Sequence, residues 1–599
     1  MSLQHIYSAA PVTTRAKVTH LGGDPKGKNF LFCNGRSVFI CDIENPLICD
    51  QYTEHQNETT VAKYSNSGYY IASGDSIGNV RIWDTVNKEH VLKIEFRALS
   101  GPIYDIDWSP DSKSIVIVGD GKEKFGVVVH YDSASSVGEI SAHSKAITSC
   151  AWKPNRPYKI VTASEDLSVN FFTGPPFKFS HSLKDYTRFI NCVRYSPTGE
   201  LFLAVSSDKS GIFYDGKLGQ KKHTLSQEDG HKSSIMSCSW NSDGTRVITS
   251  STDKTVKLWD VETGKSISTF TFSDNPTFDH QQLGTLWQGN YLLSLSLAGT
   301  ISYLDINNPS KPIRQIQGHN KSIKHISYSK QENTIFSGDY NGNIYAWEVG
   351  KGSINGFTNT GHTNQITSMD IIGDQLISVG FDDTLRKASI NDRMYKESVA
   401  LEAQPTDMAV SPKNPDISIV CTQGGINVYK NTNLVSETKV SYKPTAVSIR
   451  EDGNEVAIGG ADKKVHVFDF NGNDLKQKYE LTRHNGQITV VRYSPDGTLL
   501  ASGDTNREII VWKNKEAHNT GWVFHTSRIN TLNWAQDSIH LASGSVDGQI
   551  IIWNSDEPKK RVIIRNAHQS GVNSVAWIGE NVLASTGEDC TLKTWNIDF

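Results

Sequence analysis

The feature that most constrains the fold is a strand-like segment that ends in an aromatic residue and recurs along the whole chain. Clear copies such as VRIWD, VKLWD and IIIWN carry Trp83, Trp259 and Trp553, and weaker copies such as INVYK carry Tyr429. The anchor residues of these copies stand at positions 41, 83, 131, 172, 214, 259, 304, 347, 388, 429, 468, 512, 553 and 595. A period of roughly 40–45 residues indicates WD repeats, in which four strands form one blade of a β-propeller.

The number of repeats predicts the domain organisation. A ring of fourteen blades would exceed the usual four to eight, so we expect an all-β fold of two seven-bladed WD40 β-propellers. The polar, glycine-containing segment 348–361 (EVGKGSINGFTNTG) is the expected joint. This places an N-terminal propeller at residues 1–350 and a C-terminal propeller at residues 351–599.

The closure of the two rings leaves two alternatives. The chain ends directly after a strand of its last repeat, so the last blade needs an outer strand from elsewhere. In the simplest scheme, residues 3–9 complete the seventh blade and residues 353–358 complete the fourteenth. In the other scheme, residues 3–9 reach across to the fourteenth blade.

Three repeats carry a His, a hydroxyl residue, an Asp and a Trp in the same order. A hydroxyl, a His and an Asp also make a hydrolytic triad, but a triad occurs once and faces a cleft. A set that recurs in several blades is typical of buried polar groups that satisfy one another. We therefore expect three structural tetrads: His231, Thr249, Asp253 and Trp259; His525, Ser543, Asp547 and Trp553; and His568, Ser585, Asp589 and Trp595. Other repeats retain parts of the set: His143 and Asp166 with Phe172, and His484 and Ser502 with Trp512.

Composition argues against several classes of function. The formal net charge is −4, with 60 Lys and Arg against 64 Asp and Glu, so the chain lacks the basic excess of a nucleic-acid or membrane-surface binder. No apolar run has the length of a membrane span. The eight cysteines are scattered without a C-x-x-C motif, which favours a reduced, cytoplasmic protein.

No cofactor, metal or catalytic motif stands out. The segment 22–29 (GGDPKGKN) approaches a phosphate-binding loop, but Asn29 replaces the hydroxyl residue and a strand-like run follows instead of a helix. Histidines lack metal-ligand spacing. We therefore expect a non-enzymatic binding protein without cofactor or metal.

One repeat ending is unusual. In FFTGPPFKFSHS (171–182) two prolines follow a predicted strand, and aromatic residues come directly after them. Proline supplies no backbone donor and favours extended backbone, so we expect Gly174 and the prolines to interrupt the sheet. Phe177 and Phe179 are then expected to be exposed on the outer connection of the blade.

Several stretches depart from general WD repeats. They are residues 53–85, SGPIYDIDW with VGDGKEKFG, GPPFKF, DHQQLGTLW and residues 522–554. Together they resemble the actin-interacting protein one family, over nearly the whole chain. The resemblance implies a two-propeller protein that binds actin filaments decorated by cofilin (ADF/cofilin), promotes their severing and disassembly, and caps barbed ends. It also implies a monomer in the cytoplasm and the cytoskeleton, at cortical actin structures.

The resemblance further implies a binding surface on the third to fifth repeats. Carried over by position, its residues are Glu123 in GDGKEKFG, Glu165 before the last strand of the fourth repeat, Phe179 closing GPPFKF, and Phe189 in TRFIN. Glu165 begins a Glu-Asp pair where the family often has two aspartates. The alternative function is a general WD-repeat scaffold or adaptor in a signalling or ubiquitin-ligase complex, which would ignore filaments and cofilin.

Overall fold

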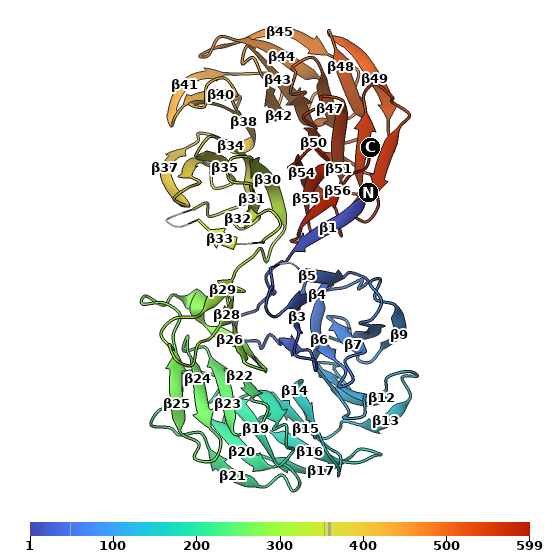
Figure 1. Cartoon of the computed structure of the whole chain (residues 1–599), viewed down its shortest axis with the longest axis vertical. Coiled ribbons are helices and arrows are strands. Elements are labelled where there is room, and N and C mark those ends of the chain that lie inside the picture. Colours follow the sequence, from blue (N-terminus) through green and yellow to red (C-terminus); the bar gives the residue numbers. More distant parts are fainter. Residues whose placement is uncertain (48, 353, 358–360) are drawn as a thin grey trace. The chain divides into compact units, whose positions relative to one another are not determined.

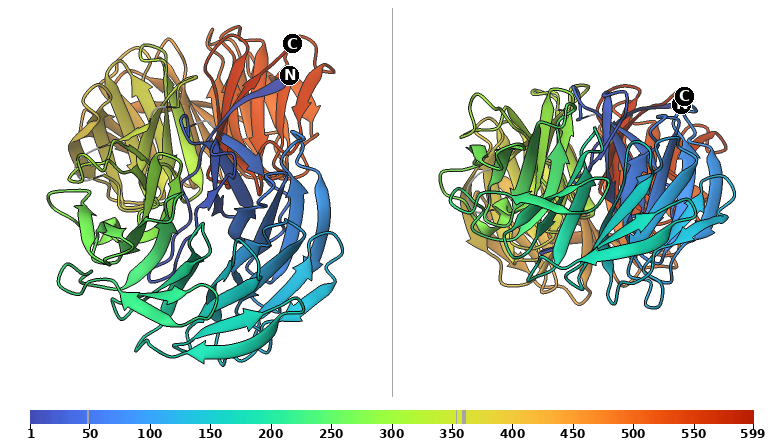
Figure 2. Two further views of the ribbon diagram at one scale, coloured as in Figure 1. Left: turned by 60° about the horizontal axis from the view of Figure 1, so that its bottom comes forward. Right: turned by 90° about the horizontal axis from the view of Figure 1, so that it is seen from below.

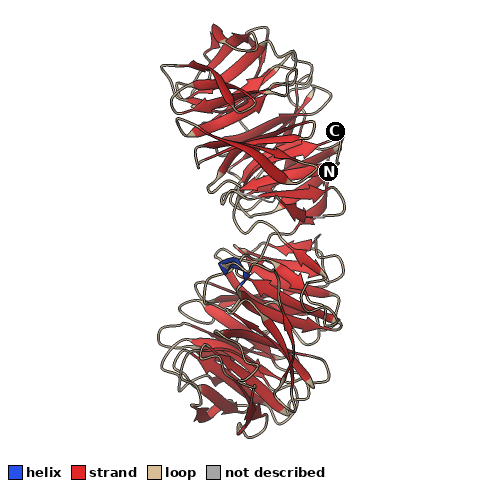
Figure 3. Cartoon of the chain, turned by 90° about the vertical axis from the view of Figure 1, so that its left-hand side faces the viewer, coloured by secondary structure: helices blue, strands red, loops and turns tan. Residues whose placement is uncertain are grey.

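The strands of the chain form fourteen four-stranded antiparallel sheets in the residues that the structure describes. The structure is a computed structural model and describes residues 1–47, 49–352, 354–357 and 361–599. The other element in these ranges is a short 3-10 helix, η1 (Phe278–His280), and Figure 3 shows strands joined by loops and turns in both units. The prediction of an all-β, fourteen-blade fold is confirmed. None of the helical residues in these ranges forms a segment that could cross a bilayer.

The chain divides into two compact units, one of them formed by residues Ala10–Asn320. We call it the first propeller and number its blades 1 to 7 in chain order (Figure 1). Its strands are β2 (Gly22–Gly23), β3 (Asn29–Asn34), β4 (Ser37–Asp42) and β5 (Cys49–Tyr52); β6 (Thr59–Tyr64), β7 (Tyr70–Asp75), β8 (Asn79–Asp84) and β9 (Leu92–Arg97); β10 (Ile103–Trp108), β11 (Ser114–Gly119), β12 (Gly126–His130) and β13 (Ser136–Glu139); β14 (Ile147–Trp152), β15 (Lys159–Ser164), β16 (Val169–Thr173) and β17 (Lys178–Leu183); β18 (Ile190–Tyr195), β19 (Leu201–Ser206), β20 (Gly211–Asp215) and β21 (Lys221–Thr224); β22 (Ile235–Trp240), β23 (Arg246–Ser251), β24 (Val256–Asp260) and β25 (Ser266–Phe270); β26 (Gln282–Gln288), β27 (Tyr291–Ser296), β28 (Ile301–Tyr303) and β29 (Arg314–Ile316).

The second unit consists of Met1–Ala9 together with Lys321–Phe599. We call it the second propeller and number its blades 8 to 14. Its strands are β30 (Ile323–Ser329), β31 (Thr334–Asp339), β32 (Ile344–Glu348) and β33 (Ile354–Gly356); β34 (Ile366–Ile372), β35 (Gln375–Gly380), β36 (Thr384–Ser389) and β37 (Met394–Ala400); β38 (Pro405–Val410), β39 (Ile417–Thr422), β40 (Ile426–Lys430) and β41 (Asn433–Thr438); β42 (Pro444–Ile449), β43 (Glu455–Gly460), β44 (Val465–Phe470) and β45 (Leu475–Leu481); β46 (Ile488–Tyr493), β47 (Leu500–Asp504), β48 (Ile509–Lys513) and β49 (Glu516–Trp522); β50 (Ile529–Trp534), β51 (His540–Ser545), β52 (Ile550–Asn554) and β53 (Arg561–Ile564); β54 (Val572–Trp577), β55 (Val582–Gly587), β56 (Leu592–Asn596) and β1 (Ser2–Tyr7).

The strand order in a blade follows from burial. The first three strands are largely buried, because each blade packs between two neighbours; in β15 five of the six residues are buried. The fourth strand is mostly polar, and β9 has no buried residue. Figure 2 shows the sheets of each unit arranged around a centre of their own. The apolar core of each propeller therefore lies between adjacent blades, as in the cluster that joins Phe171 of blade 4 to Tyr214 of blade 5.

The expected boundary at residue 350 is wrong by one repeat. Blade 7 ends with β29, and the strands around Trp347 form blade 8, which belongs to the second propeller. The junction after Asn320 follows from the repeat count, because the seventh anchor stands at 304 and the eighth at 347. The segment 348–361 therefore lies inside the second propeller, although residues 353 and 358–360 lie outside the described residues.

The second propeller is closed by the N-terminal strand. β1 pairs with β56, and Ser2 stands opposite Asn596 while Tyr7 stands opposite Leu592. β33, within the segment 353–358 that was expected here, instead completes its own blade by pairing with β32. Of the two closure schemes, the one that sends residues 3–9 to the fourteenth blade is right.

The first propeller is closed by side chains between blades 7 and 1. Tyr303 donates a hydrogen bond of 2.8 Å from its hydroxyl to the carbonyl of Ile43. The amide of Gln288 donates to the carbonyl of Asn29 at 2.8 Å. The two rings are thus sealed differently, the second by a strand from a distant part of the chain and the first by contacts between complete blades.

Candidate functional site

The three predicted tetrads occupy one end of their blades. In blade 6, Trp259 Nε1 donates to Thr249 Oγ1 at 2.8 Å, Thr249 lies 2.8 Å from His231 Nε2, and His231 Nδ1 lies 2.9 Å from Asp253. The same chain, with distances of 2.8–3.0 Å, joins the predicted residues of blades 13 and 14: His525, Ser543, Asp547 and Trp553, and His568, Ser585, Asp589 and Trp595. Every polar group in these chains bonds inside its own blade.

The Asp of each tetrad is held as a carboxylate. Burial alone would raise the pKa of Asp253, but hydrogen bonds from His231 and Thr255 and the charge of His231 lower it below its usual value. In blade 9, which lacks the Trp, the same arrangement around His362 lowers the pKa of Asp382 to about 2 against the effect of burial. These carboxylates therefore have a structural role as hydrogen-bond acceptors rather than that of poised acids or bases.

A further tetrad escaped the sequence pattern. In blade 12, His484 Nδ1 lies 3.1 Å from Asp504, His484 Nε2 lies 2.6 Å from Ser502, and Trp512 donates to Ser502 at 2.7 Å. The fourth member, Asp504, ends strand β47 instead of standing six residues before the Trp. With Glu508 this His and Asp also have the spacing of metal ligands, but both ring nitrogens of His484 are already engaged.

Both propellers have two faces that the tetrads distinguish. We call the tetrad face the end formed by the turns between the second and third strands and by the loops that lead into the first strands. Residues 164–168 and 143–146 of blade 4 belong to it, joined by the backbone hydrogen bond from Glu165 to Ala146. The opposite face carries the turns between the third and fourth strands, such as 174–177.

Glu123, Glu165 and Phe189 lie on the tetrad face of the first propeller. Glu123 is exposed in the turn between β11 and β12, and Glu165 is half-buried in the corresponding turn of blade 4. Phe189, in the loop before β18, is 48% exposed, and the Lys145 ammonium lies 5.7 Å from its ring. Because Lys145 adjoins Ala146, which bonds to Glu165, this part of the face alternates acidic, basic and aromatic groups.

The same face continues toward the centre of the ring. Tyr104 is half-buried in β10, and the pKa of its hydroxyl is raised by burial and by the nearby carboxylates of Asp120 and Glu165. Lys17, in the segment that precedes β2, lies over the Tyr104 ring at 5.4 Å. Tyr104 and Lys17 were not anticipated as site residues, although Tyr104 stands in the stretch SGPIYDIDW that carries part of the resemblance.

Phe179 lies at the other end of its blade. It stands in β17 opposite Phe172 and is 41% exposed. β16 begins at Val169, just after Glu165, and ends at Thr173, which pairs with Lys178 beside Phe179. Phe172, the residue opposite Phe179, is three residues along β16 from Val169, which at about 3.3 Å per residue is about 10 Å of strand. The four predicted residues are therefore divided between the tetrad face and the outer edge of blade 4.

The expectation that Phe177 is exposed is wrong. Phe177 is only 3% exposed, and its ring packs edge-to-face on Trp152 at 4.8 Å. Its backbone amide donates to the carbonyl of Val137 in blade 3, and an added Cβ at Gly138 would lie 2.7 Å from its nitrogen. Strand β16 ends before Gly174 and the prolines, but these residues do not interrupt the sheet, because they form the hairpin turn to β17. The turn folds back against blade 3, so that of the two phenylalanines only Phe179 is at the surface.

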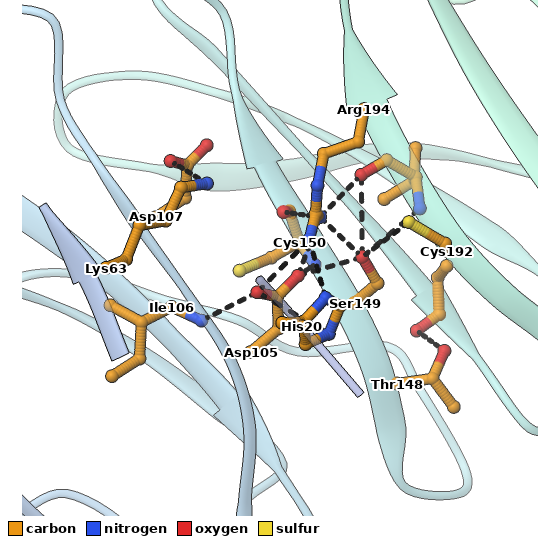
Figure 4. A network of polar contacts seen from close by, with 12 residues as sticks. His20, Lys63, Asp105, Ile106, Asp107, Thr148, Ser149, Cys150, Cys192 and Arg194 are labelled. Carbon is orange, nitrogen blue, oxygen red and sulfur yellow. Dashed lines mark hydrogen bonds and ion pairs between the residues drawn. The ribbon is translucent and has the colours of Figure 1, made fainter. Parts of the chain in front are cut away.

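A buried polar network joins the first strands of blades 3, 4 and 5. Arg194 donates to Asp105 at 2.7 Å and to Ser149 Oγ at 2.8 Å, and Ser149 also donates to Asp105 at 2.8 Å. His20 Nδ1 accepts from Arg194 at 3.1 Å (Figure 4). Burial opposes the charge of Asp105, but Arg194, His20 and Lys63 together lower its pKa well below the usual range.

This network has the residue types of a hydrolytic triad without its geometry. A nucleophilic Ser must donate its proton to a His, whereas Ser149 donates to Asp105 and His20 faces the guanidinium. Arg194 also donates to the carbonyl of Cys150 at 3.1 Å. Through His20, these contacts hold the segment before β2 against blades 3, 4 and 5.

Comparisons with known proteins agree with this architecture. The repeat family described as "WD domain, G-beta repeat" matches residues 134–173, 177–215, 219–260 and 310–348, and a family described as "WDR19 first beta-propeller" matches residues 447–598. The chain is 42% identical over 600 residues to "Actin-interacting protein 1" of Drosophila melanogaster, covering 99% of this chain and 98% of the relative. The chain belongs to the actin-interacting protein 1 family.

Other members of the family match over the same extent. "66 kDa stress protein" of Physarum polycephalum is 45% identical over 600 residues, covering 100% of this chain and 99% of its own length. "WD repeat-containing protein 1" of Gallus gallus is 40% identical over 606 residues, with the same two coverages. The likeness therefore includes both propellers and every blade, and it confirms the resemblance found in the sequence.

Proposed function

We propose that this protein binds actin filaments decorated by cofilin and promotes their severing and disassembly, and that it caps the barbed ends that result. Membership of a family with an actin-interacting relative over the full chain carries the proposal. It acts by binding, without cofactor or metal, as a monomer in the cytoplasm and at cortical actin structures of the cytoskeleton.

The binding surface that we propose runs over blades 3 to 5 of the first propeller. It combines the acidic groups of Glu123 and Glu165 with exposed Phe189 on the tetrad face, and it continues over the edge of blade 4 to Phe179. Exposed aromatic side chains surrounded by charge are the usual hot spots of protein recognition. Since Phe179 lies at the other end of the blade, the partner has to contact the outer strand β17 as well as the loops.

The chemistry of this surface suggests how it supports disassembly. Carboxylates attract basic groups of a partner and speed its association, while desolvated aromatic rings provide most of the affinity. A rigid sheet fold presents these groups without an ordering cost. Contacts with cofilin and with actin on one filament would reinforce one another, because the second contact forms at high effective concentration.

Filament disassembly tests the proposal. Glu123→Ala and Phe179→Ala proteins should keep their fold, since both side chains are exposed, but should no longer accelerate disassembly of filaments in the presence of cofilin. Tyr340→Ala, which changes a similarly exposed aromatic residue of the second propeller, is the matched control and should act like the unaltered protein. Full activity of both first-propeller variants would exclude this surface, and no effect of the unaltered protein on filaments would favour a general scaffold instead.

A further inference from the structure

The second propeller has a basic cavity that is open to solvent on its tetrad face, between blades 12 and 13. The cavity has a volume of about 650 Å³ and is lined by Thr505, Asn506, Arg507, Thr526, Ser527, Arg528 and Val546. These residues come from three neighbouring turns and loops: 505–508, 523–528 and 546–549. The site therefore belongs to the second propeller and shares no residue with the proposed surface of the first propeller.

The two arginines supply a positive charge that the rest of the cavity does not cancel. Arg507 and Arg528 are both exposed, and neither takes part in an ion pair within the part of the chain that the structure describes. Arg528 makes one hydrogen bond through Nε, to Asn530 at 3.1 Å, which leaves its outer nitrogens available. Guanidinium groups pair with carboxylates through two parallel hydrogen bonds.

The acidic residues nearest to the cavity are directed into the blades. Asp504 lies 3.1 Å from His484 Nδ1 and accepts from the backbone of Gly486. Glu508 places a carboxylate oxygen within 4.8 Å of ligand atoms of Asp504 and His484. It does not line the cavity. The lining thus keeps a net positive charge.

The third nearby carboxylate, that of Asp547, is also engaged. Asp547 lies 3.0 Å from His525 Nδ1 and accepts from the backbone amide of Thr526 at 2.8 Å. This contact also fixes the loop that carries Thr526 and Arg528, because Asp547 belongs to a tetrad of blade 13. Rigid loops hold the two arginines in place before any ligand arrives, which lowers the cost of binding.

We propose that this cavity binds an acidic peptide segment of a protein partner. Its volume far exceeds that of a single phosphate group, and its wall mixes guanidinium groups with hydroxyls, an amide and apolar Val546. Hydroxyls and the amide of Asn506 suit the backbone of a peptide, while Arg507 and Arg528 suit carboxylates at separate positions along it. Exposed Phe524, two residues before Thr526 and 47% exposed, adds an aromatic contact at the edge.

The test uses the full chain and a fluorescein-labelled peptide, Gly-Asp-Glu-Asp-Glu-Gly, with binding followed by fluorescence anisotropy at low ionic strength. Its amide counterpart, Gly-Asn-Gln-Asn-Gln-Gly, serves as the neutral probe. The unaltered protein should bind the acidic probe at least tenfold more tightly than the neutral one. An Arg507→Gln, Arg528→Gln double variant should lose at least tenfold in affinity for the acidic probe, with an unchanged circular dichroism spectrum and unfolding midpoint.

The matched control is an Arg483→Gln, Arg565→Gln double variant, which removes the same charge from exposed arginines outside the cavity and should bind as before. Absence of acidic-probe binding up to 1 mM overturns the proposal. Equal losses in both double variants also overturn it, because they would reflect the general charge of the face. If inorganic phosphate competes with an affinity equal to that of the peptide, the cavity is a simple anion site. If binding requires vesicles with phosphorylated inositol lipids, it is a membrane site. Either result rejects the proposal of a peptide site.

Discussion

Tyr7 packs edge-to-face on Trp347 with ring centroids 5.7 Å apart, and its hydroxyl accepts a hydrogen bond of 3.0 Å from the backbone of Gly350. Tyr7 belongs to the strand that completes blade 14, whereas Trp347 is the anchor of blade 8. The contact therefore lies at the seam where the first and last blades of the second propeller meet, within a buried cluster that includes Ile323 and Leu592.

This seam predicts the effect of Tyr7→Ala. The side chain is fully buried, so its loss should reduce the free energy of unfolding by about 3–5 kcal/mol. Hydrogen exchange should accelerate first in β1 and β56, because those strands lose their packing. Leu3→Ala, at a position 39% exposed in the same strand, should cost much less, and equal effects of the two substitutions would show that the seam is not the weak point.

The turn after β16 predicts opposite effects for two neighbouring phenylalanines. Phe177→Ala removes a ring buried between blades 3 and 4 and should destabilise the protein by about 3–5 kcal/mol. Phe179→Ala removes an exposed ring and should change stability by less than about 1 kcal/mol while it abolishes the action on filaments. Chemical denaturation with the disassembly assay separates the two, and a stable but inactive Phe177→Ala protein would contradict this assignment.

The buried network predicts a large cost for breaking one charge pair. Asp105→Asn leaves Arg194 without its carboxylate and should reduce stability by about 3–5 kcal/mol. A combined Asp105→Leu, Arg194→Met variant should be less unstable than Asp105→Asn, since no uncompensated charge remains. The control is Asp392→Asn, which breaks an exposed ion pair to Lys396 of 2.8 Å and should cost less than about 1 kcal/mol. A combined variant as unstable as Asp105→Asn would show that geometry, not charge, sets the cost.

Buried His55 predicts a loss of stability in mild acid. Burial lowers its pKa to about 4, with a smaller contribution from Arg81, whereas an unfolded His titrates near 6.5. Between these values the unfolded chain binds a proton that the folded chain does not. The contribution of His55 to the free energy of unfolding is therefore fully present above about pH 6.5. It falls by on the order of 2–3 kcal/mol as the pH falls toward 4.

Denaturant unfolding at several pH values checks this expectation. In His55→Gln the fall of stability between pH 6.5 and 4 should be smaller than in the unaltered protein by that amount. His518→Gln, at an exposed position, should leave the fall unchanged. An identical pH profile for both variants would mean that His55 is protonated in the folded state.

The sequence was most informative where the structure is local. Each blade is built from consecutive strands, so the spacing of anchors such as Trp259 and Trp553 predicts every blade, and the order of His, hydroxyl and Asp predicts three tetrads. Asp504 was missed because it reaches His484 from the end of a strand rather than from the usual turn. Which face a residue occupies also follows from strand order, once the strands are known.

The features that could not be predicted from the sequence depend on contacts between residues that are far apart along the chain. The pairing of β1 with β56 was the less simple of two alternatives. Both blades needed a strand, and packing around Tyr7 is what decides between them. Phe177 was expected at the surface because its neighbours are polar or proline, but Trp152 and Gly138 in other strands create the site that buries it. The cavity at Arg507 and Arg528 combines loops of two blades and has no motif.

Co-sedimentation with actin filaments, with and without cofilin, tests the central claim most directly. The unaltered protein should pellet with cofilin-decorated filaments and much less with bare ones. A Glu165→Lys, Phe189→Ala variant is altered on the tetrad face of the first propeller. Under the same conditions, the fraction of this variant that remains in the supernatant should be at least tenfold larger than that of the unaltered protein. The account would be contradicted if that variant pelleted with decorated filaments as the unaltered protein does. It would also be contradicted if neither protein pelleted with them.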